Sequence, residues 1–198
     1  MFGVRCPGCG RQGWCPCRDC VAALRPGRGP SVPGVDAVVA LFAHEGVGRA
    51  IVAAVKYRGR LQVVAWLAAA LAERCVLPVG AVTWIPASHD RIRRSGFDPG
   101  AELASAVGRC LGAPSRRLLT RAREPPQTGR SRSERLRGPR LSPSGSVPPA
   151  GRVLVVDDVV TTGSSLRVAA GVLRAAGAMS VVAAVVAHRP SPGCHIDR

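Results

Sequence analysis

Aromatic residues are scarce in this sequence, because Phe, Trp and Tyr together make up 4% of its 198 residues. Valine, leucine and alanine must therefore fill any hydrophobic core. Long apolar runs are also absent: the stretch at 61–72 ends at Glu73 and Arg74, too soon to span a hydrocarbon core about 30 Å thick. No apolar segment precedes the first cysteines, as a secretory signal would require. The sequence predicts a cytoplasmic protein that does not insert into a membrane.

Acidic residues are few, with 12 Asp and Glu against 28 Lys and Arg, and the formal net charge is +16. Such an imbalance favours an anionic partner, for example nucleic acid, phosphate or an acidic lipid surface. The alternative is a coding bias, since the basic residues are almost all arginine and the chain is also rich in Ala, Gly and Pro. Composition leaves both interpretations open.

Five of the eight cysteines lie close together near the N-terminus. In a reducing compartment disulfides are disfavoured, so these cysteines need another role. They include two CxxC pairs, and each pair can turn tightly enough to present both sulfurs to one metal ion. The spacing predicts a closed, structural zinc site. Its four ligands would be Cys6, Cys9, Cys17 and Cys20.

Alternatives to this zinc site remain open at the level of the sequence. The seven residues between the pairs are fewer than a zinc ribbon usually has, and Cys15 can replace Cys17 as a ligand. Disulfides, an iron–sulfur cluster or free thiols are the other interpretations. A segment this short cannot bury a core, so metal binding would supply its folding free energy. Cys75, Cys110 and Cys194 stand alone and are expected to pack in the core.

The rest of the chain alternates between strand and helix patterns, which predicts an α/β fold with a parallel sheet covered on both faces. Strands are expected at 35–42, 80–85, 118–121, 152–156 and 180–186, and helices at 61–74, 97–111, 164–176 and just before Tyr57. The predicted organisation is a zinc-ribbon-like module at 1–24, a Pro/Gly linker at 25–34 and a domain at 35–198 whose residues 122–151 form a long mobile loop or hairpin.

The stretch VLVVDDVVTTGSSL, at 153–166, carries the most specific chemistry. Ligands of open α/β sheets bind at the carboxyl ends of the strands, where Asp157 and Asp158 are expected to emerge. The hydroxyls and amides of Thr161, Thr162, Gly163, Ser164 and Ser165 then open a helix and can surround a phosphate. A phosphorylated sugar fits both parts, with its hydroxyls on the aspartates and its 5′-phosphate on the loop.

Other phosphate-binding motifs do not match this stretch. Residues 153–166 contain neither a GxxxxGK[ST] loop nor a GxGxxG fingerprint, which argues against a Walker-type or dinucleotide site there. An acidic pocket like that of response regulators would use the two aspartates but would leave the hydroxyl-rich turn unexplained. The plain alternative is a strand, a turn and a helix with an ordinary Ser or Thr cap.

VLVVDDVVTTGSS resembles the ribose-phosphate-binding motif of type I phosphoribosyltransferases. Over roughly residues 4–187 the chain also resembles the ComF family of competence-related proteins, in which a zinc ribbon precedes such a domain. The segments that carry this resemblance are AVKYRGRLQVVAWLAAAL, WIPASHDRIRRSGFD and PPQTGRSRSER. The resemblance implies a type I phosphoribosyltransferase-like fold with a small N-terminal zinc ribbon.

By this resemblance, Asp157 and Asp158 hold the ribose of phosphoribosyl pyrophosphate and residues 161–165 hold its 5′-phosphate. The loop from Ala87 and Ser88 to Arg91 faces the pyrophosphate, and residues 123–137 close over the site. The implied reaction displaces pyrophosphate from C1 of the sugar by a nitrogen nucleophile, with Mg²⁺ and arginines neutralising the leaving group. Those arginines are Arg91, Arg123, Arg130 and Arg135, and the catalytic set is Asp157, Asp158, Arg91 and Arg135.

The chain departs from these family patterns at several positions. Thr161 stands where purine enzymes of this class carry an aspartate base, which argues against a hypoxanthine- or guanine-type enzyme. Asp98-Pro99 replaces Asn-Gln, Ser95 stands where Arg is common, and Gly138 stands where the loop motif usually has Asn. His89 lies in the expected pyrophosphate loop, where it is a candidate acid or base or simply an exposed side chain.

The ComF resemblance also implies a role in DNA uptake together with a helicase-like partner. The alternative function is therefore a non-catalytic, nucleic-acid- or helicase-associated zinc protein with a vestigial sugar-phosphate pocket. Single-stranded DNA would bind through phosphate contacts, and Trp14 is the candidate for base stacking. With so few aromatic residues, sequence-specific reading of bases is not expected.

Overall fold

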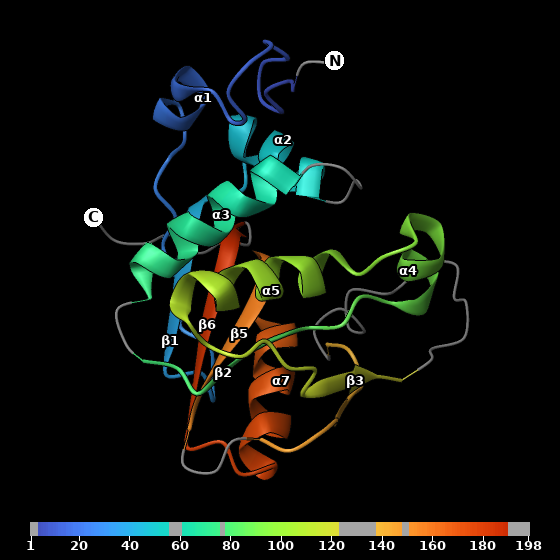
Figure 1. Cartoon of the computed structure of the whole chain (residues 1–198). Helices are drawn as coiled ribbons and strands as arrows, with labels where there is room; N and C mark the ends of the chain where they lie inside the picture. Colours follow the sequence, from blue (N-terminus) through green and yellow to red (C-terminus); the bar gives the residue numbers. More distant parts are fainter. Residues whose placement is uncertain (1–3, 56–60, 76–77, 123–137, 148–150, 190–198) are drawn as a thin grey trace.

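The structure is a computed structural model and describes residues 4–55, 61–75, 78–122, 138–147 and 151–189. Its centre is a four-stranded parallel sheet in the order β1-β6-β5-β2 (Figure 1). These strands are β1 (Ala37–Ala43), β2 (Ala81–Trp84), β5 (Arg152–Val160) and β6 (Ser180–His188). The predicted α/β fold with a parallel sheet is confirmed.

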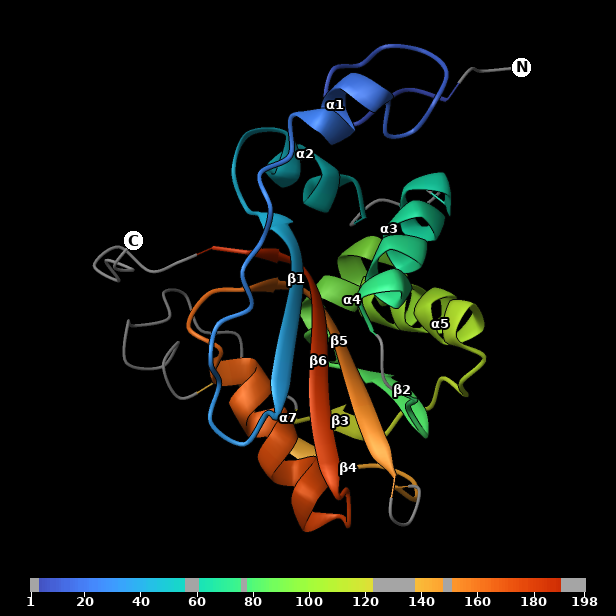
Figure 2. The same cartoon turned by 90° about the vertical axis from the view of Figure 1, so that its left-hand side faces the viewer.

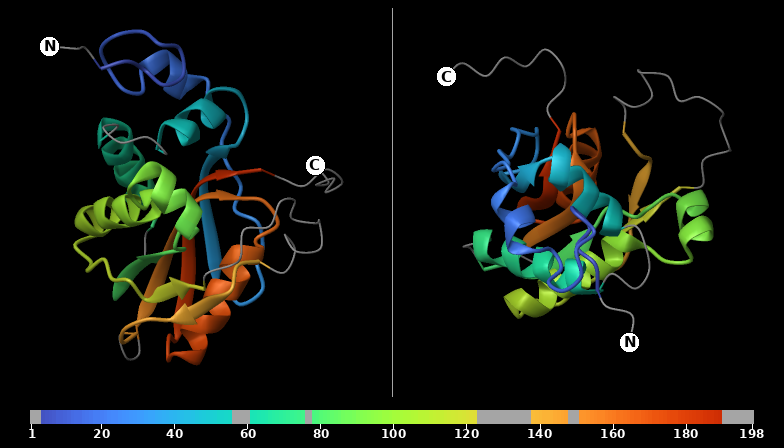
Figure 3. Two further views of the ribbon diagram at one scale, coloured as in Figure 1. Left: turned by 90° about the vertical axis from the view of Figure 1, so that its right-hand side faces the viewer. Right: turned by 90° about the horizontal axis from the view of Figure 1, so that it is seen from above.

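Helices cover both faces of this sheet. One face carries α2 (Gly46–Val55), α3 (Leu61–Arg74) and α5 (Pro99–Leu111), and the other carries α7 (Ser164–Ala175). Beside α7 lies a small antiparallel pair, β3 (Leu119–Arg121) with β4 (Leu141–Pro143) (Figure 3). The short α1 (Arg18–Ala22) belongs to the N-terminal cysteine-rich segment, and α4 (His89–Ser95) follows β2.

Burial on both faces explains why β5 reads as a continuous apolar run. Along this strand Leu154 and Val156 pack with α3 and α5, whereas Val153 and Val155 pack with α7. All four side chains are at most 1% exposed. Polar groups on β5 can therefore reach solvent only near the ends of the strand.

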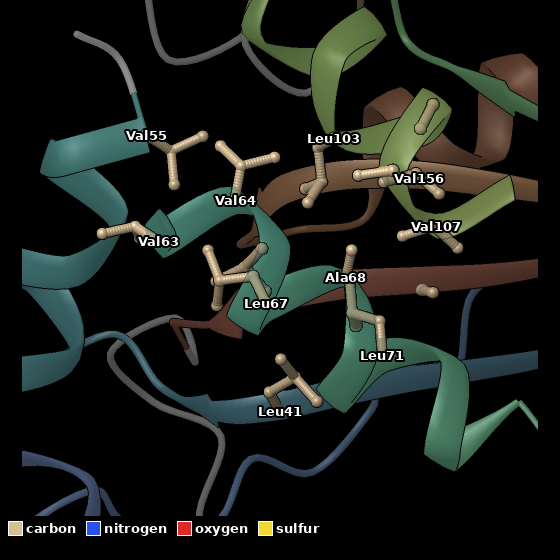
Figure 4. Packing of buried hydrophobic residues seen from close by; sticks show 14 of the residues in the cluster. Leu41, Val55, Val63, Val64, Leu67, Ala68, Leu71, Leu103, Val107 and Val156 are labelled. Atoms are coloured by element: carbon tan, nitrogen blue, oxygen red, sulfur yellow. The ribbon is translucent and has the colours of Figure 1, made fainter. Parts of the chain in front are cut away.

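The larger core cluster joins α3 to the sheet and to α5. Leu67 and Leu71 lie one turn apart on α3, and Figure 4 shows them between Leu41 of β1 and the α5 side chains Leu103 and Val107. Leucines four residues apart on a helix share one face, so α3 presents a single apolar surface to its neighbours.

The structure differs from the sequence expectations in several elements. Strand β5 continues to Val160, four residues beyond its predicted end, because pairing with β6 persists from Asp157 opposite Val185 to Val160 opposite His188. Helix α4 is unexpected, since its seven mostly charged residues have no apolar stripe. Cys110 is exposed on α5, so the expectation that it packs in the core is wrong.

Part of the predicted loop or hairpin at 122–151 is a hairpin strand, because β4 pairs with β3. Residues 123–137 and 148–150 of that segment lie outside the described residues. The predicted linker at 25–34 runs along the outer edge of β1, where Gly27 N–H donates to Leu41 O at 3.0 Å. Its division from the flanking segments at 24 and 35 stays a prediction.

None of the helices in the described ranges is long and apolar enough to cross a bilayer.

Replacing Leu67 by alanine should lower the free energy of unfolding by about 2–5 kcal/mol, because the change leaves a cavity at a fully buried position. Leu67→Met, which nearly preserves the volume, should cost less than about 1.5 kcal/mol. Equilibrium unfolding in urea measures both. Equal losses for the two variants would contradict the packing described for α3.

Candidate functional site

The carboxyl end of β5 carries two adjacent carboxylates, Asp157 and Asp158, within the strand rather than after it. Each side chain accepts a hydrogen bond from the backbone of the next residue. Asp158 N–H donates to Asp157 Oδ1 at 2.9 Å, and Val159 N–H donates to Asp158 Oδ1 at 2.8 Å. These bonds fix the orientation of both carboxylates while one oxygen of each is not used in them.

Arg91 reaches this pair from α4. Its Nη2 donates to Asp158 Oδ2 at 3.2 Å, and the two residues are 67 positions apart in the sequence. They meet because β2 and β5 are parallel neighbours, so the chain leaving β2 emerges at the same sheet edge. Ser88 begins α4 as its N-cap, with its Oγ accepting from Arg91 N–H at 3.4 Å. The structure thus brings together three of the four predicted catalytic residues.

Asp157 and Asp158 differ in their electrostatic surroundings. Burial of the Asp157 carboxyl, and after it the negative charge of Asp158, raise the pKa of Asp157 well above its usual range. The Arg91 guanidinium lies against Asp158, whose side chain is 25% exposed. A ligand that donates hydrogen bonds, or a cation, would therefore relieve repulsion between the carboxylates.

Residues 161–165 form a tight loop that opens α7. Gly163 has a φ of +72°, in the left-handed region that favours glycine, and stands directly before the first helical residue. Thr162 Oγ1 donates to Ser164 Oγ at 3.2 Å, while Ser164 N–H donates back to Thr162 Oγ1 at 3.4 Å. Hydroxyls and the first helical N–H groups gather at the positive end of α7, which is suited to an anion.

Asp98 fixes the loop that holds Ala87 and Ser88. Its Oδ2 accepts from Trp84 Nε1–H at 3.0 Å and from Ala87 N–H at 3.3 Å. Its Oδ1 accepts from Gly100 N–H at 3.1 Å and so caps α5. The bonds to Trp84 and Ala87 could not be predicted from the sequence, because contacts across fourteen and eleven positions leave no local signal.

Gly138, the first residue after the predicted closing segment 123–137, lies close to the start of α7. Gly138 has a φ of +78°, and a Cβ placed on it would lie 2.9 Å from Ser164 O and 3.1 Å from Val168 Cγ2. Any residue other than glycine would force the two segments apart. The remaining predicted arginines of the site, Arg123, Arg130 and Arg135, lie outside the described residues. His89 is exposed on the first turn of α4.

A second site lies in the N-terminal segment. The sulfurs of Cys6, Cys9, Cys17 and Cys20 all lie within 4.8 Å of one another. Four sulfurs about 2.3 Å from a tetrahedral zinc ion would be about 3.8 Å apart, and Cys9 Sγ is 3.7 Å from Cys17 Sγ. These four thiols can therefore hold a metal ion such as zinc. Cys15 is outside the cluster.

Two local features concern the packing of this cluster and the ionisation of Cys6. A Cβ on Gly8 would lie 2.6 Å from Cys20 Sγ, so the turn between the first two cysteines requires glycine. Burial disfavours the Cys6 thiolate, but hydrogen bonds from the backbone of Cys17, Cys9 and Gly8 outweigh it and lower the pKa of Cys6 to about 6. The described cysteines form no disulfide.

Comparison with protein-family models assigns the C-terminal half of the chain. The family model described as the phosphoribosyl transferase domain matches residues 92–198. Solved structures to which the chain is similar include an allosteric regulatory enzyme of purine biosynthesis, with 25% identity, a TM-score of 0.46, and coverage of 62% of this chain and 25% of that one. No curated protein matches the chain.

Two further solved structures have comparable similarity. Glutamine phosphoribosylpyrophosphate amidotransferase from B. subtilis has 24% identity and a TM-score of 0.45, with 62% of this chain and 25% of that one covered. Purine phosphoribosyltransferase from Pyrococcus horikoshii has 18% identity and a TM-score of 0.43, with 68% and 77% covered. The chain thus spans about a quarter of the length of the first two structures.

Cys17→Ser should remove bound zinc from the purified protein, because the substitution takes one thiolate from a four-sulfur cluster. Cys15→Ser is the matched control, two positions away and outside the cluster, and should retain one zinc ion per chain. Native mass spectrometry measures the stoichiometry. Loss of zinc in the Cys15 variant but not in the Cys17 variant would show that the ligand set is different.

Proposed function

The chain belongs to the phosphoribosyl transferase domain family, and from this premise we propose that it binds phosphoribosyl pyrophosphate with Mg²⁺ and transfers its phosphoribosyl group to a nitrogen nucleophile. One arrangement supports the proposal above all. The two carboxylates of β5, the cation of Arg91 and the hydroxyl-rich start of α7 lie at the carboxyl edge of one sheet. In parallel sheets this edge is the usual place for a ligand.

Each part of the donor has a chemically suitable partner at this edge. Ribose hydroxyls would donate hydrogen bonds to Asp157 and Asp158. An ionised carboxylate accepts hydrogen bonds and does not donate them, so it suits hydroxyl groups. The 5′-phosphate would accept from residues 161–165, where backbone N–H groups and hydroxyls converge at a helix N-terminus. The pyrophosphate would face Ala87 and Ser88, beside Arg91.

In the proposed reaction the bond from C1 to the pyrophosphate oxygen breaks and a bond from C1 to the acceptor nitrogen forms. Negative charge grows on the departing pyrophosphate, and a guanidinium such as that of Arg91 stabilises it electrostatically. Arg135 is proposed for the same role, from the segment outside the described residues. Positive charge grows on the sugar ring, close to the carboxylates of Asp157 and Asp158.

Mg²⁺ suits the residues at this site. Hard cations prefer carboxylate oxygens, and the raised pKa of Asp157 marks a position where an added positive charge would be favourable. Asp157 and Asp158, together with oxygens of the donor, would hold the ion. When bound, Mg²⁺ would neutralise charge on the pyrophosphate.

A second proposed function concerns nucleic acid, and the exposure of Trp14 favours it. This indole is 82% exposed in the cysteine-rich segment, where Arg5, Arg11 and Arg18 are also exposed. An exposed aromatic ring in a segment that also carries exposed arginines is suited to stacking a base of single-stranded DNA. A role in DNA uptake with a helicase-like partner, as the ComF resemblance implies, would use this surface.

Asp158→Asn should abolish binding of phosphoribosyl pyrophosphate and Mg²⁺ at millimolar donor concentration, a loss of about 2–5 kcal/mol, because a charged acceptor next to Arg91 is neutralised. Zinc content should not change. Isothermal titration calorimetry measures the affinity. The control is Glu102→Gln, which removes the same charge from an exposed position on α5.

The proposal fails if the wild-type protein shows no heat of binding with this donor. It also fails if Glu102→Gln weakens binding as strongly as Asp158→Asn, since the effect would then come from net charge rather than from the β5 carboxylates.

Trp14→Ala should weaken binding of a single-stranded oligonucleotide by about 1–3 kcal/mol, the usual contribution of one stacked base. Binding of the wild-type protein should also weaken steeply as salt rises, because phosphate contacts release counterions. Fluorescence anisotropy measures both. Met179→Ala, which removes an apolar side chain that is 67% exposed just before β6, is the control. An affinity that does not depend on salt would contradict this function.

A further inference from the structure

Residues 25–36, here called the strap, connect the cysteine-rich segment to β1 and run along the outer edge of that strand (Figure 2). At their start, Ala43 N–H donates to Arg25 O at 2.9 Å and Gly27 N–H donates to Leu41 O at 3.0 Å. The approach is close, since a Cβ on Gly29 would lie 1.7 Å from Val38 O. The first half of the strap is therefore fixed to β1.

The second half of the strap is fixed to α7 and β6. Arg174 of α7 donates from Nε to Gly34 O at 2.9 Å and from Nη2 to Asp36 Oδ1 at 2.5 Å. Asp36 Oδ2 accepts from Val181 N–H at 2.9 Å, and Asp36 N–H donates to Val181 O at 2.8 Å. A segment held at both ends in this way places its middle residues accurately.

Val32 lies between these attachments, and 4% of its surface is exposed. It is the one buried residue in the fully described segment 25–34. It packs in the core cluster that includes Val160, Leu166 and Ala170. It also lies against the candidate phosphate loop, because a Cβ on Gly163 would meet Val32 Cγ2 at 2.6 Å and Cγ1 at 3.4 Å. Val32, the only branched apolar residue in segment 25–34, thus contacts Gly163 of the candidate phosphate loop.

We propose that Val32 is a positioning residue for the phosphate loop, which it holds in shape through its contact with Gly163. The proposal rests on the proposed function, in which residues 161–165 receive the 5′-phosphate. Gly163 has a positive φ and is followed at once by α7, where Arg167 N–H donates to Gly163 O at 2.8 Å. A glycine can leave this conformation at little steric cost, so a neighbouring side chain must restrict it.

The test compares three variants of the full chain. Val32→Ala removes the methyl groups that touch Gly163. Val32→Thr keeps the branched shape and buries a hydroxyl, so it lowers stability while keeping the contact. Val153→Ala is the matched control, because Val153 is equally buried in the same core cluster but lies at the start of β5, near the opposite edge of the sheet.

Thermal unfolding, donor affinity by calorimetry and amide hydrogen exchange are measured on each variant. All three variants should have a lower Tm. Only Val32→Ala should raise the Kd for phosphoribosyl pyrophosphate with Mg²⁺, by about three- to thirtyfold, the usual size of coupling through packed side chains. Exchange of the Arg167 amide, which reports the bond to Gly163, should also be faster in Val32→Ala than in Val153→Ala.

The proposal is overturned if Val32→Ala binds the donor as tightly as the wild-type protein, or if Val153→Ala weakens binding to the same extent. Unchanged exchange at Arg167 in Val32→Ala overturns it as well, and this readout needs no ligand. Failure of this proposal can therefore be told apart from failure of the proposed function. Faster exchange at Arg167 in Val32→Ala, in a protein that never binds the donor, would support the positioning role and contradict the proposed binding of phosphoribosyl pyrophosphate.

Discussion

The parallel pairing of β5 with β6 on one side and β2 on the other is the constraint on which the candidate site depends. Two helical layers bury both faces of β5, so its residues from Val153 to Val156 must be apolar. Polar chemistry is possible only where the layers end, and there the chain places Asp157 and Asp158. The same pairing brings the segment after β2 to that edge, which is how Arg91 meets Asp158.

Electrostatics at this edge are incompletely balanced within the described residues. Two neighbouring carboxylates lie near the end of β5, and the guanidinium of Arg91 is bonded to Asp158 rather than to Asp157. Burial and the second carboxylate make ionisation of Asp157 unfavourable, whereas the start of α7 is positive. The carboxylates of Asp157 and Asp158 can accept hydrogen bonds from hydroxyl groups, and the start of α7 can accept an anion. This edge is therefore complementary to a molecule that carries both hydroxyls and a phosphate. Such complementarity favours binding over a purely structural role for these residues.

Local patterns in the sequence were sufficient for the sheet, for both flanking layers and for the four cysteines. They were sufficient because period and spacing are properties of neighbouring residues. Features that depend on contacts between residues far apart in the sequence could not be predicted from such local patterns. Helix α4 has no apolar stripe, the bonds from Asp98 to Trp84 and Ala87 cross a turn, and the strap reads as an ordinary linker because its Pro and Gly residues signal irregular chain. Strand β5 was predicted too short because carboxylates are rare in strands, yet pairing with β6 continues through them.

Two of the positions at which this chain departs from the family pattern that it resembles, Asp98 and Gly138, have local physical reasons. Three N–H groups converge on both oxygens of Asp98, so an asparagine there would direct its own NH₂ group toward a donor. Gly138 combines a positive φ with a contact to Ser164 O that no Cβ can occupy without displacement. Both residues support the loops around the site and neither belongs to the β5 carboxylates or the phosphate loop. These two departures therefore fall on residues that shape the loops around the site, where one arrangement of backbone can replace another.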